Sequence, residues 1–284
     1  MSTQIFEKQI QYLTDHWTVQ PAAKINDPDV AGLFITFDDG MQNNYTTVLP
    51  ILEKYGLTAL FAVCPGLVVG KVPHIWQHHI YLILKQAVDE AVLLPMDGYD
   101  QPIAVTSHNI EPLVMAFSDW VDRKQLVDVY GAIQEICEYN SLQYARLDYL
   151  PDMFHPMTWE MIADLGARGH VIASHTWSHR ILRLLSMQEK KWELERSKAT
   201  LETYLGRAVE NIVYPYGTSQ TVDGETLSLA RRAGYRLGFL NVPFKLFESA
   251  GMNIGRFGLP SSFFRPDLHA TISGIKHLLF ERAA

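Results

Sequence analysis

The sequence predicts an α/β protein built on a largely parallel sheet or barrel. Short apolar runs alternate with helix-like segments along most of the chain, and polar residues follow several of these runs directly. Strands that alternate with helices are typical of βα units, whose strands run parallel. Since chemistry in such barrels lies at the carboxyl ends of the strands, these polar residues are the first candidates for a site.

Each element is predicted from its own pattern. Five apolar runs indicate buried strands at 32–37, 58–64, 170–174, 210–217 and 235–241. Apolar residues at helical spacing predict helices at 42–56, 158–169, 186–206 and 223–234. We expect Thr158 and Ser186 to be N-caps and Gly56 to end the first of these helices.

Residues 70–156 depart from this alternation. This segment carries six prolines and two isolated helix-like stretches, at 75–92 and 123–140. We interpret it as a helical insertion between the second and third βα units of a single domain that spans residues 1–284.

Composition restricts the class of protein. The 284 residues are 48% hydrophobic, which allows a sizeable core, and the net charge of −7 argues against general binding to nucleic acid or anionic membranes. The first residues lack the features of a signal peptide, and no apolar run nears the roughly 20 residues that span a bilayer. Cys64 and Cys137 are expected to be reduced thiols, and a cytoplasmic protein is the default expectation.

Two adjacent carboxylates, Asp38 and Asp39, follow the first predicted strand in "LFITFDDG". Asp-Gly is a common hairpin signal, so a simple turn is one interpretation. The other is a site that needs two carboxylates in different roles.

A pair of histidines follows the third predicted strand. His175 and His179 in "SHTWSH" are four residues apart, a spacing that on a helical turn can hold one metal ion. The same spacing occurs at His74 and His78, which we interpret as a polar helix face. His175 differs because it ends a strand at the edge where the two aspartates are expected. Two histidines and one carboxylate leave positions open on a metal ion, which is typical of catalytic sites, and the second carboxylate is then available as a base.

Three segments of the chain resemble, in the same order, the first three motifs of the NodB-homology polysaccharide deacetylases, carbohydrate esterase family 4. They are "TFDDG", "SHTWSH" and "VYPYG". The resemblance covers about 30–65 and 155–240. It implies a distorted, incomplete (β/α) barrel that hydrolyses N- or O-acyl groups, usually the N-acetyl group of a sugar.

The resemblance also implies roles for individual residues. Asp38 is expected to be the general base. Asp39, His175 and His179 are expected to bind one divalent ion, most often zinc. The backbone N–H of Tyr216 is expected to bind the oxyanion.

Three departures from the family pattern affect the site, and one is that the family's fourth motif, an aspartate that orients the general acid, is not found. Val213 stands where many members have an arginine that steadies the catalytic aspartate, and Arg256 is our candidate for its substitute; an outward-facing residue at a strand end is the alternative. The family's Leu-x-His, which supplies the general acid, is not found after residue 240, because His269 and His277 have other surroundings. Trp177 and Arg256 are the candidates for contact with substrate.

The sequence therefore predicts a metal-dependent hydrolase that removes an acetyl or formyl group from the nitrogen of a carbohydrate or sugar precursor, in surface-polysaccharide metabolism. Two alternatives stay open: a hydrolase of a small non-sugar amide, and a binding or scaffold protein with a decayed site.

Overall fold

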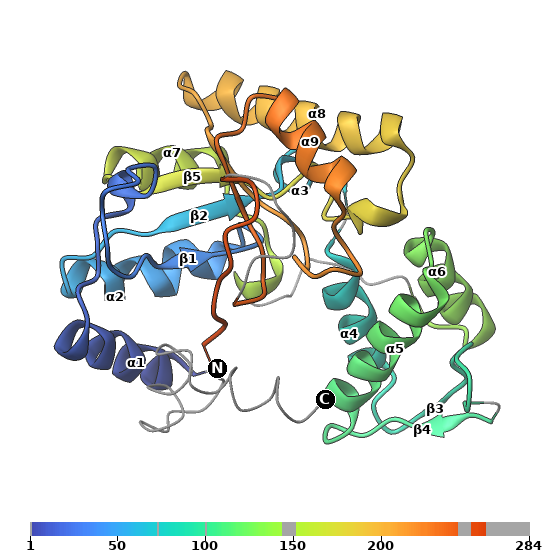
Figure 1. Cartoon of the computed structure of the whole chain (residues 1–284). Coiled ribbons are helices and arrows are strands. Elements are labelled where there is room, and N and C mark those ends of the chain that lie inside the picture. The colour runs from blue at the N-terminus through green and yellow to red at the C-terminus, as the bar shows by residue number, and fades with distance from the viewer. Residues whose placement is uncertain (1, 73, 100, 144–151, 244–250, 260–284) are drawn as a thin grey trace, which may run out of the picture.

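The structure is a computed structural model that describes residues 2–72, 74–99, 101–143, 152–243 and 251–259. At its centre, five parallel strands lie side by side in the order β1-β2-β5-β6-β7. They are β1 Thr36–Phe37, β2 Leu60–Val63, β5 Val171–Ser174, β6 Asn211–Val213 and β7 Leu237–Phe239. Figure 1 shows this curled sheet with helices around it. The predicted fold class, an incomplete (β/α) barrel, is confirmed.

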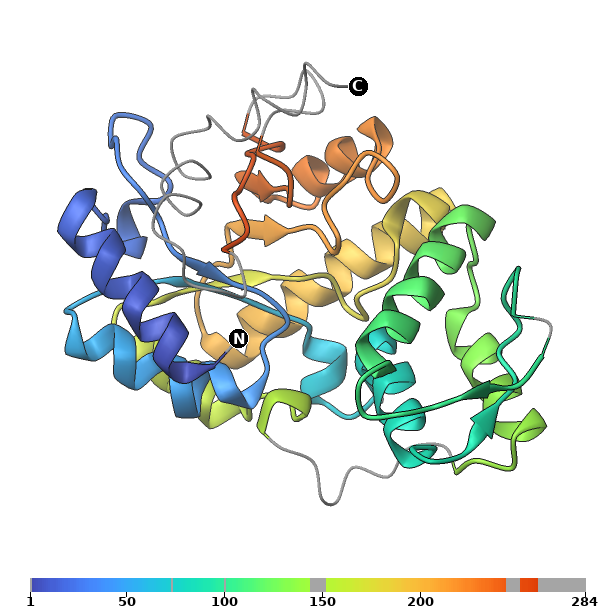
Figure 2. The ribbon, with the colours of Figure 1, turned by 90° about the horizontal axis from the view of Figure 1, so that it is seen from below.

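Helices cover the outer face of the sheet (Figure 2). The longer ones are α1 Thr3–His16, α2 Leu49–Lys54, α7 Trp159–Ala167, α8 Met187–Leu205 and α9 Gly224–Arg232. Short turns of helix are η1 Ala22–Lys24, η2 Asn44–Val48, α3 Pro65–Val68, η3 Asp152–Phe154 and η4 Leu182–Leu184. Both predicted caps are confirmed: the side chains of Thr158 and Ser186 accept hydrogen bonds from the first turns of α7 and α8.

The two faces of the sheet are buried in different cores. Along β2, Phe61 and Val63 pack with the outer helices, whereas Leu60 and Ala62 belong to a smaller cluster on the inner face. All four side chains are fully buried. Parallel strands that are covered on both faces are expected to be apolar throughout, which is the pattern that made β2 recognisable in the sequence.

The segment between β2 and β5 differs in detail from the prediction. It forms α4 Trp76–Gln86, a hairpin of β3 Ala91–Val92 and β4 Ile103–Ala104, then α5 Ile110–Lys124 and α6 Val129–Tyr139. The helix predicted at 75–92 ends early because its last residues form β3. The helix predicted at 123–140 begins only at Val129, as α6, because Gln125 adopts a left-handed conformation with φ 49° and ends α5, a helix that the sequence analysis did not predict.

This insertion has a hydrophobic core of its own. Trp76, Ile80, Phe117 and Ile133 are buried in it, and Ile181 from the polypeptide after β5 joins the same cluster. The interpretation of the chain as one domain stays a prediction. Both cysteines are buried and unbridged. In the described part of the chain, the helices are too short or too polar to cross a membrane.

Candidate active site

The two aspartates lie in a tight loop after β1. The Asp-Gly sequence does form a turn, but because β1 pairs with β2 in parallel this turn does not make a hairpin. Asp39 and Gly40 are both left-handed, with φ 73°. A Cβ on Gly40 would lie 3.1 Å from Cγ1 and 3.2 Å from Cα of Val63, so the loop needs glycine to approach the end of β2.

The loop that carries both histidines follows β5. Residues 175–179 are not helical, so the four-residue spacing does not work through a helical turn as expected. Instead, side chains accept hydrogen bonds from four successive backbone N–H groups. Ser174 accepts from Thr176 at 3.2 Å, and Oε2 of Glu193 accepts from Trp177 and from Ser178, each at 2.9 Å. Thr176 Oγ1 accepts from His179 at 3.2 Å.

Backbone strain is concentrated at this edge of the sheet. Seven described residues other than glycine have positive φ, and four belong to the site loops: Asp39, Thr176, His179 and Tyr216, with φ between 59° and 73°. A positive φ is especially unfavourable for a β-branched residue such as Thr176. Strained residues persist only where the surroundings hold them, which is the pattern expected of a functional site.

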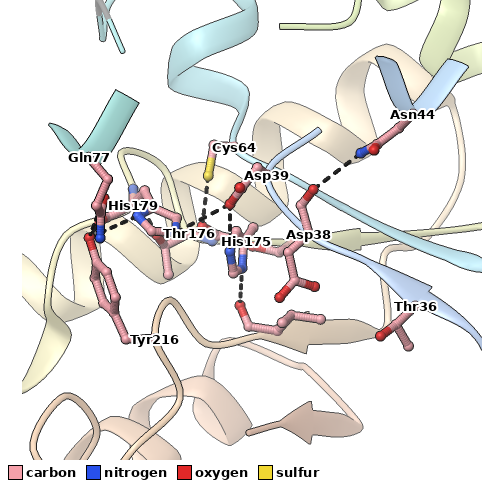
Figure 3. A network of polar contacts seen from close by, with 12 residues as sticks. Thr36, Asp38, Asp39, Asn44, Cys64, Gln77, His175, Thr176, His179 and Tyr216 are labelled. Carbon is pink, nitrogen blue, oxygen red and sulfur yellow. Dashed lines mark hydrogen bonds and ion pairs between the residues drawn. The ribbon is translucent and has the colours of Figure 1, made fainter. Parts of the chain in front are cut away.

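The side chains of Asp39, His175 and His179 form a candidate metal centre (Figure 3). Oδ1 of Asp39 lies 3.3 Å from Nε2 of His175 and 3.4 Å from Nε2 of His179. The three ligand atoms all lie within 4.8 Å of one another. One carboxylate oxygen and two imidazole nitrogens are a ligand set that suits zinc and leaves further positions open.

The far nitrogen of each imidazole has its own partner. Nδ1 of His175 lies 2.7 Å from the carbonyl oxygen of Val213, and Nδ1 of His179 lies 3.1 Å from the hydroxyl of Tyr216. Partners of this kind orient metal-binding histidines and fix their tautomers. The residues present therefore fit a divalent ion.

Asp38 is held apart from this cluster by Arg256. The guanidinium bonds both carboxylate oxygens of Asp38, each at 2.7 Å, and also donates to Thr36 and to the carbonyl of Leu240. The side chain of Arg256 is only 12% exposed, so the contact with Asp38 that the sequence predicted is present and the outward-facing alternative is wrong. Partial burial raises the pKa of Asp38, but Arg256 outweighs this effect, so the pKa lies below its ordinary value.

The second aspartate is also kept ionised, by different partners. Burial raises the pKa of Asp39, but hydrogen bonds from His175 and His179 outweigh it and hold the pKa well below its ordinary value. The neighbouring carboxylates thus have separate partners, a guanidinium for Asp38 and two imidazoles for Asp39, which allows both to carry charge within one loop.

The remaining candidates from the sequence have different surroundings. Tyr216 lies in the loop after β6, and in the described part of the chain its backbone N–H has no hydrogen-bond acceptor. Trp177 is only 7% exposed and packs against Cys64 and Leu67, with Arg196 over its ring at 5.2 Å. That burial favours a packing role over contact with substrate. His269 and His277 lie outside the described residues.

Sequence reasoning missed two residues of the site and misjudged one histidine of the insertion. Glu193, 1% exposed, supports the histidine loop from α8, and Gln77 on α4 contacts Tyr216. The sequence of α8 contains several other acids, so Glu193 could not be singled out before its burial was known. His74 is 4% exposed, so it does not belong to a polar helix face as predicted.

An incomplete (β/α) barrel with two carboxylates and two imidazoles at the carboxyl edge of its strands has the architecture of the NodB-homology fold. The sequence profile described as "Polysaccharide deacetylase" matches residues 26–150 and 151–238, most of the chain. The chain belongs to the polysaccharide deacetylase family.

Individual relatives agree with this assignment. A curated relative from Bacillus subtilis, YxkH, is named as a polysaccharide deacetylase and is 30% identical over 98 residues. That match covers 34% of this chain and 34% of the relative, so the chain spans about a third of the length of the curated protein it matches.

Solved structures share the fold at low sequence identity. The Streptococcus pyogenes deacetylase PplD, solved with acetate, has a TM-score of 0.56 at 17% identity, over 95% of this chain and 86% of that one. IcaB from Ammonifex degensii has a TM-score of 0.51 at 18% identity, and the match covers 96% of this chain and 88% of IcaB. A de-N-acetylase from Aggregatibacter actinomycetemcomitans has a TM-score of 0.51 at 13% identity, and the match covers 95% of this chain and 87% of that one.

Glu193 generates a prediction about stability. Glu193→Ala removes the acceptor of one buried and one partly buried backbone N–H group and of the Ser178 hydroxyl, so we expect the free energy of unfolding in urea to fall by about 3 kcal/mol. Glu195→Ala, on the exposed side of the same helix, is the control and should change it by less than about 0.5 kcal/mol. Equal effects of the two substitutions would contradict the role given to Glu193.

Proposed function

We propose that this protein is a metal-dependent amide hydrolase that removes an acetyl or formyl group from the nitrogen of a carbohydrate or sugar precursor. The observation that carries the proposal is that the two adjacent aspartates of the loop after β1 have different partners. Asp39 faces two imidazoles and is available as a metal ligand, while Asp38, fixed by Arg256, is available as a base.

In this proposal the metal is a divalent ion, zinc, which when bound would supply Lewis-acid activation of the acyl carbonyl and of water. Asp39, His175 and His179 would hold the ion. Asp38 accepts the proton that the attacking water loses, because Arg256 keeps its carboxylate ionised and in one orientation. The backbone N–H of Tyr216 donates to the oxyanion of the tetrahedral intermediate. A general acid must protonate the departing amine, and none of these residues is assigned to that role.

The choice of substrate rests on relatives. The family is named for polysaccharides, and one structure of similar fold is a de-N-acetylase. We therefore propose an N-acylated sugar, in the assembly or modification of a surface polysaccharide. The small non-sugar amide stays the alternative substrate, and the cytoplasmic location stays a prediction.

Metal binding is the first test of the proposal. The purified chain should contain about one divalent ion, and His175→Ala or His179→Ala should lose most of it, because each removes one of only three protein ligands. Elemental analysis measures the content, and His108→Ala, an exposed histidine of the insertion, is the control. Full occupancy in His175→Ala would exclude this metal centre, and a wild type that binds no ion would favour the scaffold alternative.

The base is tested separately. Asp38→Asn should retain the metal but lower kcat by at least about 100-fold, because a neutral carboxamide cannot accept the proton. Release of acetate from an acetylated chito-oligosaccharide, together with metal content, distinguishes the two effects. If the substitution also emptied the metal site, Asp38 would be a ligand and the assignment of the two aspartates would be reversed.

Arg256 generates a prediction about pH. Its charge lowers the pKa of Asp38, so the base stays ionised to lower pH, and activity is lost as pH falls through that pKa. Arg256→Ala should therefore move the acid limb of the kcat profile to higher pH and lower kcat about 10- to 100-fold, with the metal retained. Arg256→Lys should recover only part, since a single ammonium cannot reproduce the bidentate contact. An unchanged acid limb in Arg256→Ala would show that Arg256 does not act through the base.

A further inference from the structure

The insertion contributes α4 to the edge of the sheet where the candidate metal centre lies. Figure 3 shows Gln77 of this helix beside the hydroxyl of Tyr216, and the same hydroxyl beside the imidazole of His179. The next residue along α4 is His78. We propose that His78 is the general acid of this site, which protonates the amine that departs when the amide bond breaks. This inference rests on the hydrolytic function proposed above.

The position of His78 follows from two contacts of α4. Its neighbour Gln77 reaches the hydroxyl of Tyr216, in the loop after β6, at 3.3 Å. Its own ring packs edge-on against the ring of Phe154, with centroids 5.2 Å apart. The residues that follow Phe154 hydrogen-bond the loop of the two aspartates. His78 thus lies between a contact to one loop of the centre and a contact to the segment that fastens another.

The imidazole of His78 is available to a substrate. Its side chain is partly exposed, and within the described part of the chain neither ring nitrogen has a hydrogen-bond partner or is fully buried. Other hydrogens near the centre are already donated within the protein. The thiol of Cys64 donates to the carbonyl of His175 at 3.0 Å, and the hydroxyl of Tyr216 donates to Gln77. His78 differs from both because its nitrogens can still meet a substrate.

The step transfers one proton from His78 to the substrate. Asp38 has by then taken a proton from the attacking water, and the acyl carbon is tetrahedral. As the C–N bond breaks, its electron pair stays on nitrogen, which takes the proton of the His78 imidazolium and leaves as an amine. The oxyanion re-forms a carbonyl, so the acyl group becomes a carboxylic acid. Neutral His78 then takes a proton from the solvent and Asp38 releases one, which restores both residues.

The surroundings of His78 set the pH range in which it can carry this proton. Burial lowers its pKa, the charge of Asp39 raises it, and a charge on His179 lowers it. His74, four residues earlier, has a pKa of about 4, which burial and charges on His78 and His155 lower, so it is neutral near pH 6. The pKa of His78 therefore lies below its ordinary value. Amide hydrolysis should be lost as pH rises through that pKa.

Two leaving groups distinguish a general acid from a packing residue. The full chain is loaded with zinc, and hydrolysis of an acetylated chito-oligosaccharide is compared with that of 4-nitrophenyl acetate, whose nitrophenolate departs without a proton. His78→Gln and His78→Phe should each lower kcat for the amide at least about 100-fold, but kcat for the aryl ester less than about 3-fold. His78→Phe keeps a ring against Phe154, and His108→Gln, at an exposed position of the insertion, is the control.

Two further readouts are expected. The zinc content of His78→Gln should equal that of the wild type, because the substitution removes none of the proposed ligands. In the wild type, kcat for the amide should fall at the pKa that an NMR titration gives for His78 in the zinc-loaded chain, and kcat for the aryl ester should lack this basic limb.

The outcomes separate the inference from the function on which it rests. Asp38→Asn should slow both substrates, which would show that both are hydrolysed at this site. Equal losses for the two substrates in His78→Gln, or an unchanged rate for the amide, would overturn the role of His78 while leaving the proposed function intact. A wild type that hydrolyses neither substrate would instead overturn the proposed function itself.

Discussion

The candidate site depends most on the hydrogen bonds that the buried carboxylate of Glu193 accepts. It accepts hydrogen bonds from two successive backbone N–H groups of the loop after β5, and the hydroxyl of Ser178 donates to it as well. Without these bonds two backbone donors of the loop would lose their acceptor, and less would offset the unfavourable backbone of Thr176 and His179. Because Glu193 belongs to the long helix α8, the outer layer of the barrel fixes the geometry at its edge.

A second constraint is the separation of two like charges. Asp38 and Asp39 are adjacent in sequence, yet one faces a guanidinium and the other faces two imidazoles. The left-handed turn at Asp39 and Gly40 directs the two side chains to these different partners. Each carboxylate keeps a lowered pKa for its own reason, so a pair of charges that would otherwise repel can serve as base and ligand.

The insertion has a closer relation to the site than its position in the sequence suggests. Its core includes Ile181, just beyond the histidine loop, and its first long helix contacts Tyr216. The end of the insertion and the residue after it also hydrogen-bond the aspartate loop: Gln42 donates to the carbonyl of His155 at 2.7 Å, and Met157 donates to that of Gly40 at 2.8 Å. The insertion thus bears on both loops of the candidate centre.

The sequence by itself determined the alternation of strands and helices, the caps at Thr158 and Ser186, and the polar residues at the strand ends, because these depend on local periodicity and on hydrogen bonds within a few residues. It also singled out Arg256, although only the resemblance to a family that has an arginine in that place gave a reason to look for one. Tertiary structure alone decided how Glu193 supports the histidine loop, how Gln77 meets Tyr216 and how α5 and α6 separate at Gln125. Contacts such as that between Gln77 and Tyr216, 139 residues apart, leave no periodic pattern, since they form only when the packed core brings distant segments together.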